Sequence, residues 1–204
     1  MKKMKQIVTI FAALALAVTA GLSFAGTKTK AAGSDEFTRT AIEIAADMGY
    51  GWNLGNTMEA TNTWTHNPKV TDFETAWGQP VTTKAMIDGI KKAGFNSIRI
   101  PVSWSNMMSS DGNYTIDASY FKRVDEIISY AFANDMYVII NDHYDGGWWE
   151  HFCGNKRDCM KHYKNMWTQV AGHYKNYSEK LIFESANEEL GDTLKKSLSK
   201  IDVN

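Results

Sequence analysis

Short apolar runs alternate with amphipathic helical periods along the chain, and this order limits the possible folds more than any other feature. The runs at 50–54, 96–101, 136–141 and 181–185 are predicted to be strands. The last two are nearly all apolar rather than alternating, which is typical of strands that are covered on both faces. The pattern therefore predicts a parallel sheet with helices outside it, either a barrel or an open doubly wound sheet.

Three segments between the predicted strands have helical spacing. Thr82 and Thr83 precede the first, and Gly94 is placed to end it. Asp117 is predicted to cap the second, and the third is expected over about residues 157–177. The apolar stripes are Met86, Ile87, Ile90 and Ala93; Phe121, Val124, Ile127, Ile128 and Ala131; and Met160, Tyr163, Trp167, Val170, Tyr174 and Tyr177. Each stripe predicts a helix with one face on the sheet.

The first 25 residues differ from the rest of the chain. Three lysines precede an apolar run that starts at Ile7, and Ser23 and Ala25 have the spacing that signal peptidase accepts. This pattern indicates a secretory signal peptide over residues 1–25. A transmembrane anchor is the alternative, because the run is nearly long enough to span a bilayer. Polar residues within the run, and the lack of a basic cluster directly after it, favour the signal peptide.

The rest of the chain is expected to be a flexible leader at 26–35 and part of one folded domain at 36–204. Cleavage at residue 25 predicts a secreted, extracellular protein with no stable membrane association. The net charge of −1 includes the three lysines of the signal peptide, so the mature charge would be −1 − 3 = −4. There is no basic excess to neutralise phosphates, and no nucleic acid partner is expected.

Two cysteines, Cys153 and Cys159, are six positions apart. In an oxidising compartment they can close a small loop as a disulfide, and two free thiols are the alternative. No histidine stands at a suitable spacing, so no metal site is predicted. The chain also lacks the glycine-rich phosphate loops and the GxSxG elbow. No cofactor is therefore expected, and a nucleotide enzyme or an α/β-hydrolase is not supported.

Polar residues gather where three of the predicted strands end. Arg99 lies inside the second strand, the segment 141–145 with His143 follows the third, and Asn187 and Glu188 follow the fourth. The carboxyl ends of parallel strands form the active face of α/β proteins. Each group also has a structural explanation: Arg99 could balance a buried acid, His143 could be a core histidine, and the Asn-Glu pair could be a solvated turn.

Aromatic residues accompany these groups, and the whole chain has seven tryptophans. Indole rings stack on the apolar faces of sugars, while Asn, His and carboxylates bind the hydroxyls; a core role is the alternative. A polysaccharide fits such a cleft, and it fits export because polymers do not enter the cell. The candidate substrate-binding residues are Trp52, Asn53, Trp77, Trp104, Tyr144, Trp148 and Trp149.

Five stretches together carry a resemblance to a known family. They are GWNLGNT (51–57), ETAWGQPVTT (74–83), GFNSIRIPVSW (94–104), MYVIINDHYDGGWW (136–149) and FESANE (183–188). In this order they resemble glycoside hydrolase family 5, and most closely its secreted bacterial endoglucanases (cellulases). The resemblance implies a (β/α)8 TIM barrel, of which about the first four strands are present, and retaining hydrolysis of β-1,4-glucan.

The resemblance also assigns roles to individual residues. It implies that Glu188 is the general acid/base and that Asn187 holds the 2-hydroxyl of the reacting sugar. Arg99 would sit under the nucleophile and keep it ionised. His143 matches the first of two histidines that often follow the third strand, and Tyr144 stands at the second.

The second carboxylate of a retaining glycosidase lies roughly 5–5.5 Å from the first. In the family this nucleophile comes from the seventh strand, so it is expected beyond Asn204. The chain by itself is then expected to be inactive. The alternatives are a non-catalytic glycan-binding remnant, or a family member that acts on xyloglucan, mannan or xylan.

Overall fold

Four short strands form one parallel sheet whose strand order follows the sequence. They are β1 (Gly51–Asn53), β2 (Ser97–Ile100), β3 (Tyr137–Asn141) and β4 (Leu181–Glu184). All four predicted strands are present, and the predicted parallel arrangement is confirmed.

The computed structural model describes residues 39–152 and 154–187, and these residues lie within one compact unit. The predictions of a signal peptide and a leader lie outside the described residues, as do Cys153 and Glu188. No helix in the described part of the chain is long and apolar enough to cross a membrane.

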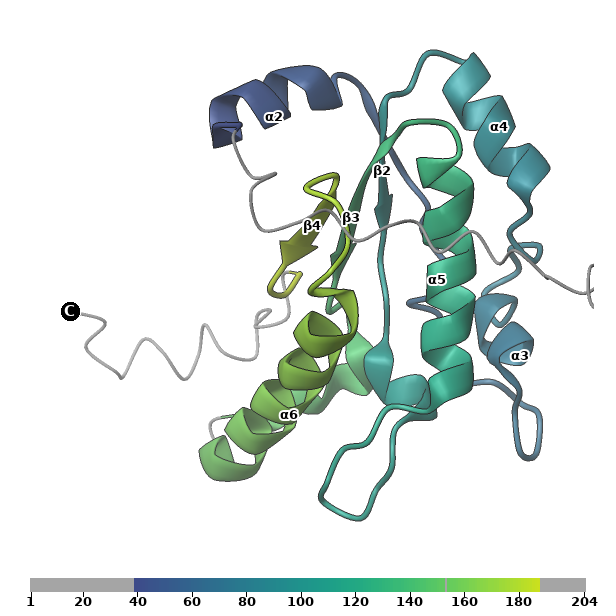
Figure 1. Cartoon of the computed structure of the whole chain (residues 1–204). Coiled ribbons are helices and arrows are strands. Elements are labelled where there is room, and N and C mark those ends of the chain that lie inside the picture. The colour runs from purple at the N-terminus through teal and green to yellow at the C-terminus, as the bar shows by residue number, and fades with distance from the viewer. Residues whose placement is uncertain (1–38, 153, 188–204) are drawn as a thin grey trace, which may run out of the picture. The chain divides into compact units, whose positions relative to one another are not determined.

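Helices of very different length surround the sheet (Figure 1). They are α2 (Ala41–Met48), α3 (Val70–Glu74), α4 (Lys84–Lys92), α5 (Ala118–Phe132) and α6 (Lys156–Tyr174), with 3-10 turns η1 (Trp104–Met107) and η2 (Asp145–His151). The three predicted helices are α4, α5 and α6. The two missed helices, α2 and α3, precede β1 and α4.

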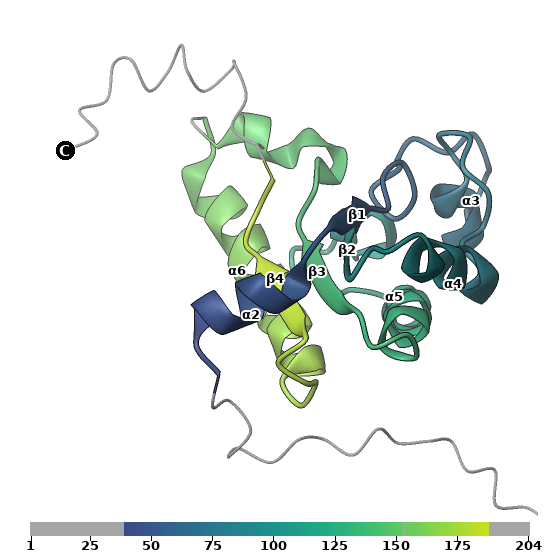
Figure 2. The same cartoon turned by 90° about the horizontal axis from the view of Figure 1, so that it is seen from above.

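The predicted caps of α4 and α5 are confirmed. The Thr83 side chain accepts a bond from the N–H of Met86 at the start of α4, and Asp117 does the same for Ser119 at the start of α5. Gly94 follows α4 with φ +98°, a conformation that glycine adopts without strain. Figure 2 shows α4 and α5 next to each other on one side of the sheet.

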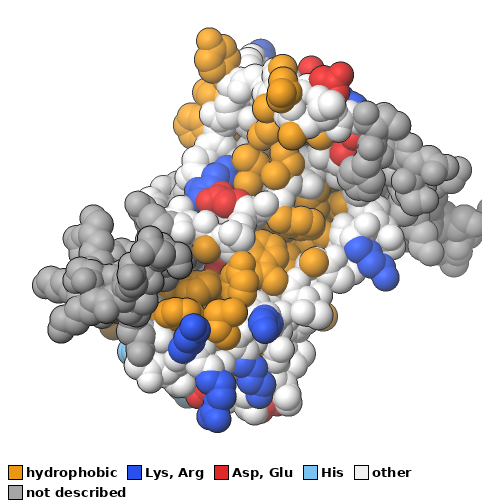
Figure 3. Space-filling model, turned by 90° about the vertical axis from the view of Figure 1, so that its left-hand side faces the viewer, with side chains coloured by type: hydrophobic (Ala, Val, Ile, Leu, Met, Phe, Trp, Pro, Cys, Tyr) orange, Lys and Arg blue, Asp and Glu red, His pale blue; other side chains and the backbone are white. Residues whose placement is uncertain are grey.

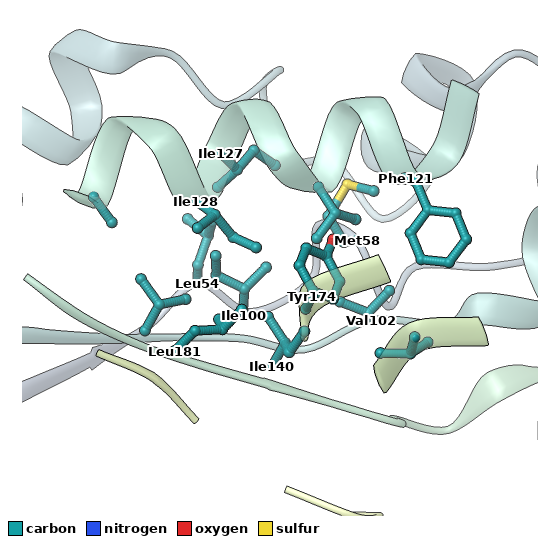
Figure 4. Close-up of a cluster of buried hydrophobic side chains, with 14 of the residues drawn as sticks. Leu54, Met58, Ile100, Val102, Phe121, Ile127, Ile128, Ile140, Tyr174 and Leu181 are labelled. Atoms are coloured by element: carbon teal, nitrogen blue, oxygen red, sulfur yellow. The ribbon is translucent and has the colours of Figure 1, made fainter. Parts of the chain in front are cut away.

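The hydrophobic core lies between these helices and the sheet (Figure 4). On the strands, every second side chain points toward the helices, so the core takes only alternate residues. The buried core residues of β2, β3 and α5 are Ile98, Ile100, Val138, Ile140, Tyr120, Phe121, Val124, Ile127, Ile128 and Ala131. This set includes the whole predicted stripe of α5.

Helix α6 differs from its prediction in two ways. It ends at Tyr174 instead of Tyr177, which is held in a following turn by a backbone bond to Tyr174. Its buried face is also rotated, because Tyr163 and Trp167 are only partly buried. The buried residues are Cys159, His162, Met166, Val170 and Tyr174. Trp167 lies beside Phe183 of β4, with ring centroids 6.1 Å apart, at the open edge of the sheet.

That open edge exposes apolar surface. β4 pairs with β3 on one side and with no strand on the other among the described residues. Phe183 is 42% exposed. Figure 3 shows hydrophobic side chains gathered in a band across the face that carries α2, β4 and α6. An edge strand of this kind can accept a further neighbour.

At the carboxyl ends of the strands, the positions that point away from the helices carry polar side chains. The register pairs Asn53 with Arg99 and Asn141 with Glu184. The core residues Ile98 and Ile140 flank these positions on the opposite face. The alternation of the strands therefore separates a dry face toward the helices from a polar face toward the carboxyl ends.

Candidate active site

Arg99 is the centre of the polar face. Its Nε and Nη2 donate to the two carboxylate oxygens of Glu184, at 2.6 and 2.8 Å. Nη2 also donates to Oδ1 of Asn187 at 2.9 Å, and Nη1 donates to Oδ1 of Asn53 at 3.0 Å. One planar guanidinium therefore fixes side chains from β1, β4 and the segment after β4, which a lysine could not do.

Glu184 is the acid that Arg99 balances. The paired hydrogen bonds from Arg99 hold the pKa of Glu184 below its ordinary value, so the carboxylate stays ionised. Both side chains are partly exposed, at 23% and 33%. From the sequence, the charge of Arg99 balancing a buried acid was only the alternative to a catalytic role. Glu184 lies opposite Asn141 in the register of the sheet, which the sequence alone does not provide.

Asn187 is held at both its backbone and its side chain. Its N–H donates to the carbonyl of Asp142 at 2.9 Å, and its Oδ1 accepts from Arg99. Asn187 is thus tied to Asp142, directly after β3, and to Arg99 in β2. Glu188, the predicted acid/base, is the next residue and lies outside the described residues.

His143 lies in the same group. Its backbone N–H donates to Val102, and its carbonyl accepts from the hydroxyl of Ser103 at 2.8 Å. Nδ1 lies 3.3 Å from Nδ2 of Asn141, which can only donate. In the neutral ring, Nδ1 therefore accepts this bond and Nε2 carries the proton. After Arg99, a hydrogen bond with Asn141 and then the charge that His143 carries when protonated lower the pKa of Glu184.

Glu59 is a buried acid that the sequence did not single out. It is 3% exposed, and its carboxylate accepts the N–H groups of Asn56 and Thr57 in the turn after β1. Burial raises the pKa of Glu59, and the charge of Arg99 opposes that rise. The available sequence signal was the position of Glu59, three residues after Asn56 and two after Thr57, where a carboxylate can accept backbone N–H groups of a turn. Glu59 stabilises the turn that follows Asn53.

Two predicted stacking residues form an exposed pair. The rings of Trp77 and Tyr144 have centroids 6.1 Å apart and are tilted by 52°. Trp77 is 41% exposed and Tyr144 is 40% exposed. The two residues come from separate loops, one before α4 and one after β3. We call this pair the Trp77–Tyr144 platform.

The prediction that Trp104 binds substrate is wrong. Its side chain is completely buried, and its indole N–H donates to the carbonyl of Asn141 at 2.9 Å. Its ring packs against Tyr120 and Phe121 with centroids 6.1 and 5.4 Å away. Trp104 is a core residue, because η1 turns it toward α5.

The predicted roles of Trp148 and Trp149 also change. Trp149 is buried and donates to Oδ2 of Asp142, so the prediction that it stacks on substrate is wrong. Trp148 is half-buried, and it stacks on Trp149 at 4.0 Å and on His162 at 4.2 Å. Its ring faces are used within the protein. Both tryptophans stabilise the turn η2.

Trp52 faces the helices and not the group around Arg99, and its predicted role in substrate binding stays a prediction. Side chains alternate along β1, so Trp52 points away from the face that carries Asn53. Its ring contacts Phe95 edge-on at 5.4 Å. It lines a groove of about 510 Å³ between β1 and α4, which also includes Met86 and Ile90.

The cysteines and the possible metal ligands lie partly within the described residues. Cys159 is a free thiol in the structure and is buried, with Sγ 3.6 Å from the carbonyl of Trp148. Cys153 lies outside the described residues, so the disulfide between them stays a prediction. Within 39–152 and 154–187, no three His, Cys, Asp or Glu residues are grouped so that they could hold a metal ion.

Comparison with known proteins decides the family. The family model described as cellulase (glycosyl hydrolase family 5) matches residues 58–202. The chain belongs to glycosyl hydrolase family 5. Endoglucanase A of Paenibacillus barcinonensis is 44% identical over 183 residues, which cover 87% of this chain and 44% of that protein.

Solved family 5 structures give the fold. A GH5-4 broad specificity endoglucanase from Ruminococcus champanellensis with bound cellotriose has a TM-score of 0.69 and 43% identity. That match covers 73% of this chain and 43% of the other. A family 5 lichenase from Caldicellulosiruptor sp. F32 has a TM-score of 0.68 and 45% identity, covering 74% and 40%.

These comparisons confirm the predicted (β/α)8 TIM-barrel class. The four described parallel strands and their helices are part of such a barrel. The chain spans less than half the length of the relatives named above. In a barrel the polar face of the sheet points inward, so Arg99 and Glu184 lie at the carboxyl-terminal end of the interior, where active sites of this fold are found.

Proposed function

We propose that this chain forms part of a secreted endo-β-1,4-glucanase and carries its general acid/base. The observation that carries the proposal is the hydrogen-bonded group in which Arg99 joins Asn53, Glu184 and Asn187 at the carboxyl ends of the strands. Its relatives support the proposal, because several are endoglucanases and one contains cellotriose.

Glu184 does not fit the role of proton donor. Both of its oxygens accept bonds from Arg99, and its lowered pKa keeps it ionised. A general acid needs a raised pKa so that it holds a proton near neutral pH. Glu184 therefore orients Arg99, and the acid is assigned to a neighbouring carboxyl.

Glu188 is the carboxyl that we assign to that role. It follows Asn187, whose backbone and side chain are fixed to β3 and Arg99. Anchoring the preceding residue limits where Glu188 can reach and favours a constant position over the glycosidic oxygen. Glu188 would protonate the leaving sugar and later deprotonate the attacking water.

The nucleophile is the second requirement of a retaining mechanism. The family resemblance assigns it to the seventh strand, and the described residues contain four strands. Arg99 would face that carboxylate across the barrel interior and stabilise its charge. Because Nη1 and Nη2 already bond Asn53 and Glu184, Arg99 would meet the nucleophile as a preorganised charge.

Substrate binding is assigned to the polar and aromatic groups around Arg99. His143 and Asn187 would bond sugar hydroxyls, and the Trp77–Tyr144 platform would stack on a pyranose face. We propose β-1,4-glucan as the polymer. Xyloglucan, mannan and xylan are alternatives that the platform does not distinguish, because all present similar sugar faces.

Secretion completes the proposal. A polymeric substrate has to be met outside the cell, and residues 1–25 have the composition of a signal peptide. Mass spectrometry of the exported protein should give a mature N-terminus at residue 26. An intact N-terminus in the membrane fraction would contradict this.

The test of the function is Glu188→Gln in a protein that carries this chain with the remaining strands of the barrel. Turnover of β-1,4-glucan should fall about 10²–10⁴-fold, whereas aryl glycosides with good leaving groups should lose less in the glycosylation step. Cellotetraose binding should persist. Wild-type turnover of carboxymethyl-cellulose by this variant would contradict the assignment.

Glu43→Gln is the matched control. Glu43 closes the capping box of α2 at the opposite end of the strands, and glutamine preserves such a box. This variant should keep full turnover. Binding of cellotetraose by the unmutated protein, with no hydrolysis of any glucan, would favour the glycan-binding remnant instead.

A further inference from the structure

Four successive residues after β3 have positive φ angles. Tyr144 has φ 57° and Asp145 has φ 48°, followed by Gly146 at 72° and Gly147 at 73°. Glycine adopts this region freely, but tyrosine and aspartate do so at a cost. Such strain persists only where the surroundings fix it, and at this position it places an exposed aromatic ring.

The Asp145 side chain supplies the fixing contacts. It is 1% exposed, and its Oδ1 accepts the N–H of Ser105 at 2.6 Å. Its Oδ2 accepts the Ser105 hydroxyl at 2.8 Å and the Trp148 indole N–H at 2.6 Å. The carboxylate thus ties the strained turn to η1 through Ser105 and, within η2, to Trp148.

A stack of rings supports these contacts from α6. His162 stacks on Trp148 at 4.2 Å and on Tyr114 at 4.4 Å with nearly parallel planes. Its Nε2 lies 3.0 Å from the Ser105 hydroxyl. Because that hydroxyl donates to Asp145, it accepts from Nε2–H of His162. The contacts of Asp145 are therefore buttressed from a long helix.

We propose that Asp145 is a positioning residue for glycan binding. Through Ser105 and Trp148 it holds the turn so that Tyr144 keeps its positive φ, with ψ −53°, and its ring stays beside Trp77. The Trp77–Tyr144 platform then exists before substrate arrives. Without the carboxylate, the backbone of Tyr144 relaxes toward negative φ and the ring leaves Trp77. The identity of the bound sugar rests on the proposed function, whereas the positioning of the Tyr144 ring by Asp145 does not.

Asp145→Asn is the informative substitution. Asparagine tolerates positive φ as well as aspartate does, so the backbone preference is kept. The change replaces one acceptor oxygen with an NH₂ group. A donor of Ser105 or Trp148 would then face another donor and lose its hydrogen bond. Ser105→Ala removes one bond to the carboxylate, and Ser105→Thr retains the hydroxyl and serves as the conservative rescue.

Asp135→Asn is the matched control. Asp135 also has a positive φ, 56°, and its side chain also has a partner, Lys180. It stands just before β3, at the amino-terminal ends of the strands, away from the platform. Any general cost of changing an aspartate in a left-handed turn appears in this variant too.

The first readout is NMR on the full chain without sugar. The wild type should show a strong intraresidue amide-to-Hα NOE at Tyr144, the sign of positive φ, and NOEs between the Tyr144 and Trp77 rings. Asp145→Asn and Ser105→Ala should weaken both, while Ser105→Thr and Asp135→Asn keep them. Unchanged NOEs in folded Asp145→Asn, or none in the wild type, would overturn the proposal.

The second readout is titration with cellotetraose. If Asp145→Asn leaves the platform formed about a tenth of the time, binding should weaken about tenfold. Trp77→Ala should weaken binding in every background. If the wild type and Trp77→Ala bind cellotetraose equally, the platform does not bind the sugar. The NOEs then still decide whether Asp145 positions the Tyr144 ring. If Trp77→Ala weakens binding and Asp145→Asn does not, the positioning proposal fails alone.

Discussion

Replacing Trp104 with phenylalanine separates core tryptophans from sugar-binding ones. The Asn141 carbonyl would lose the buried indole N–H that bonds it at 2.9 Å, which costs about 1–3 kcal/mol. Phenylalanine would also leave roughly 40 Å³ unfilled against Tyr120 and Phe121, or about 1 kcal/mol at 24 cal/mol per Å³. The lost burial of apolar surface adds about 1 kcal/mol.

The free energy of unfolding should therefore fall by about 3–5 kcal/mol, a large share of the roughly 5–15 kcal/mol typical of a domain. Urea unfolding followed by far-UV circular dichroism measures the change. Cellotetraose affinity of the folded fraction should stay the same, because no part of Trp104 is exposed.

Trp77→Ala is the paired variant with the opposite expectation. Trp77 is 41% exposed, so its loss should change the free energy of unfolding by less than about 1 kcal/mol while weakening cellotetraose binding. The reasoning is refuted if Trp104→Phe weakens sugar binding with an unchanged urea midpoint.

Three further predictions concern charge and redox state. Arg99→Lys should lower the free energy of unfolding by roughly 1–2 kcal/mol and let the pKa of Glu184 rise toward its ordinary value, measured by urea titration and carboxyl NMR; an unchanged pKa would contradict the fork geometry. Burial lowers the pKa of His162, so below about pH 6.5 the unfolded state binds more protons than the folded state. The free energy of unfolding should therefore decrease as the pH is lowered through this range. His162→Gln should flatten that fall in urea midpoints between about pH 5 and pH 7.5, and an identical slope would exclude His162 as a cause. Cys153 and Cys159 should form a disulfide in the exported protein, adding at most about 2–3 kcal/mol, and mass spectrometry without reductant that finds two free thiols would reject it.

The strands and the long helices were predictable because their signals are local. The apolar run at 136–141 and the stripe from Phe121 to Ala131 both follow from spacing alone. The face of α6 was predicted with an offset because Tyr163 and Trp167 border an open edge of the sheet. Spacing identifies an apolar stripe, but the depth of burial depends on what the helix packs against.

The site was predictable only in part. Arg99, Asn187 and His143 could be named because they lie near the carboxyl ends of strands that end together. The partner of Arg99 could not, because it depends on the register that places Glu184 opposite Asn141. Trp104 failed for a related reason: in the sequence a buried tryptophan and an exposed one look the same, and the turn η1 decides between them.

The most direct test is the anomeric configuration of the first product of β-1,4-glucan hydrolysis. The measurement uses a protein that carries this chain with the remaining strands of the barrel, and proton NMR follows the new reducing end before mutarotation. With Glu188 as acid/base of a retaining mechanism, the β-anomer should appear first, and Glu188→Gln should abolish its formation. An α-anomer formed first, or β-anomer formation at an unchanged rate by Glu188→Gln, would contradict the account.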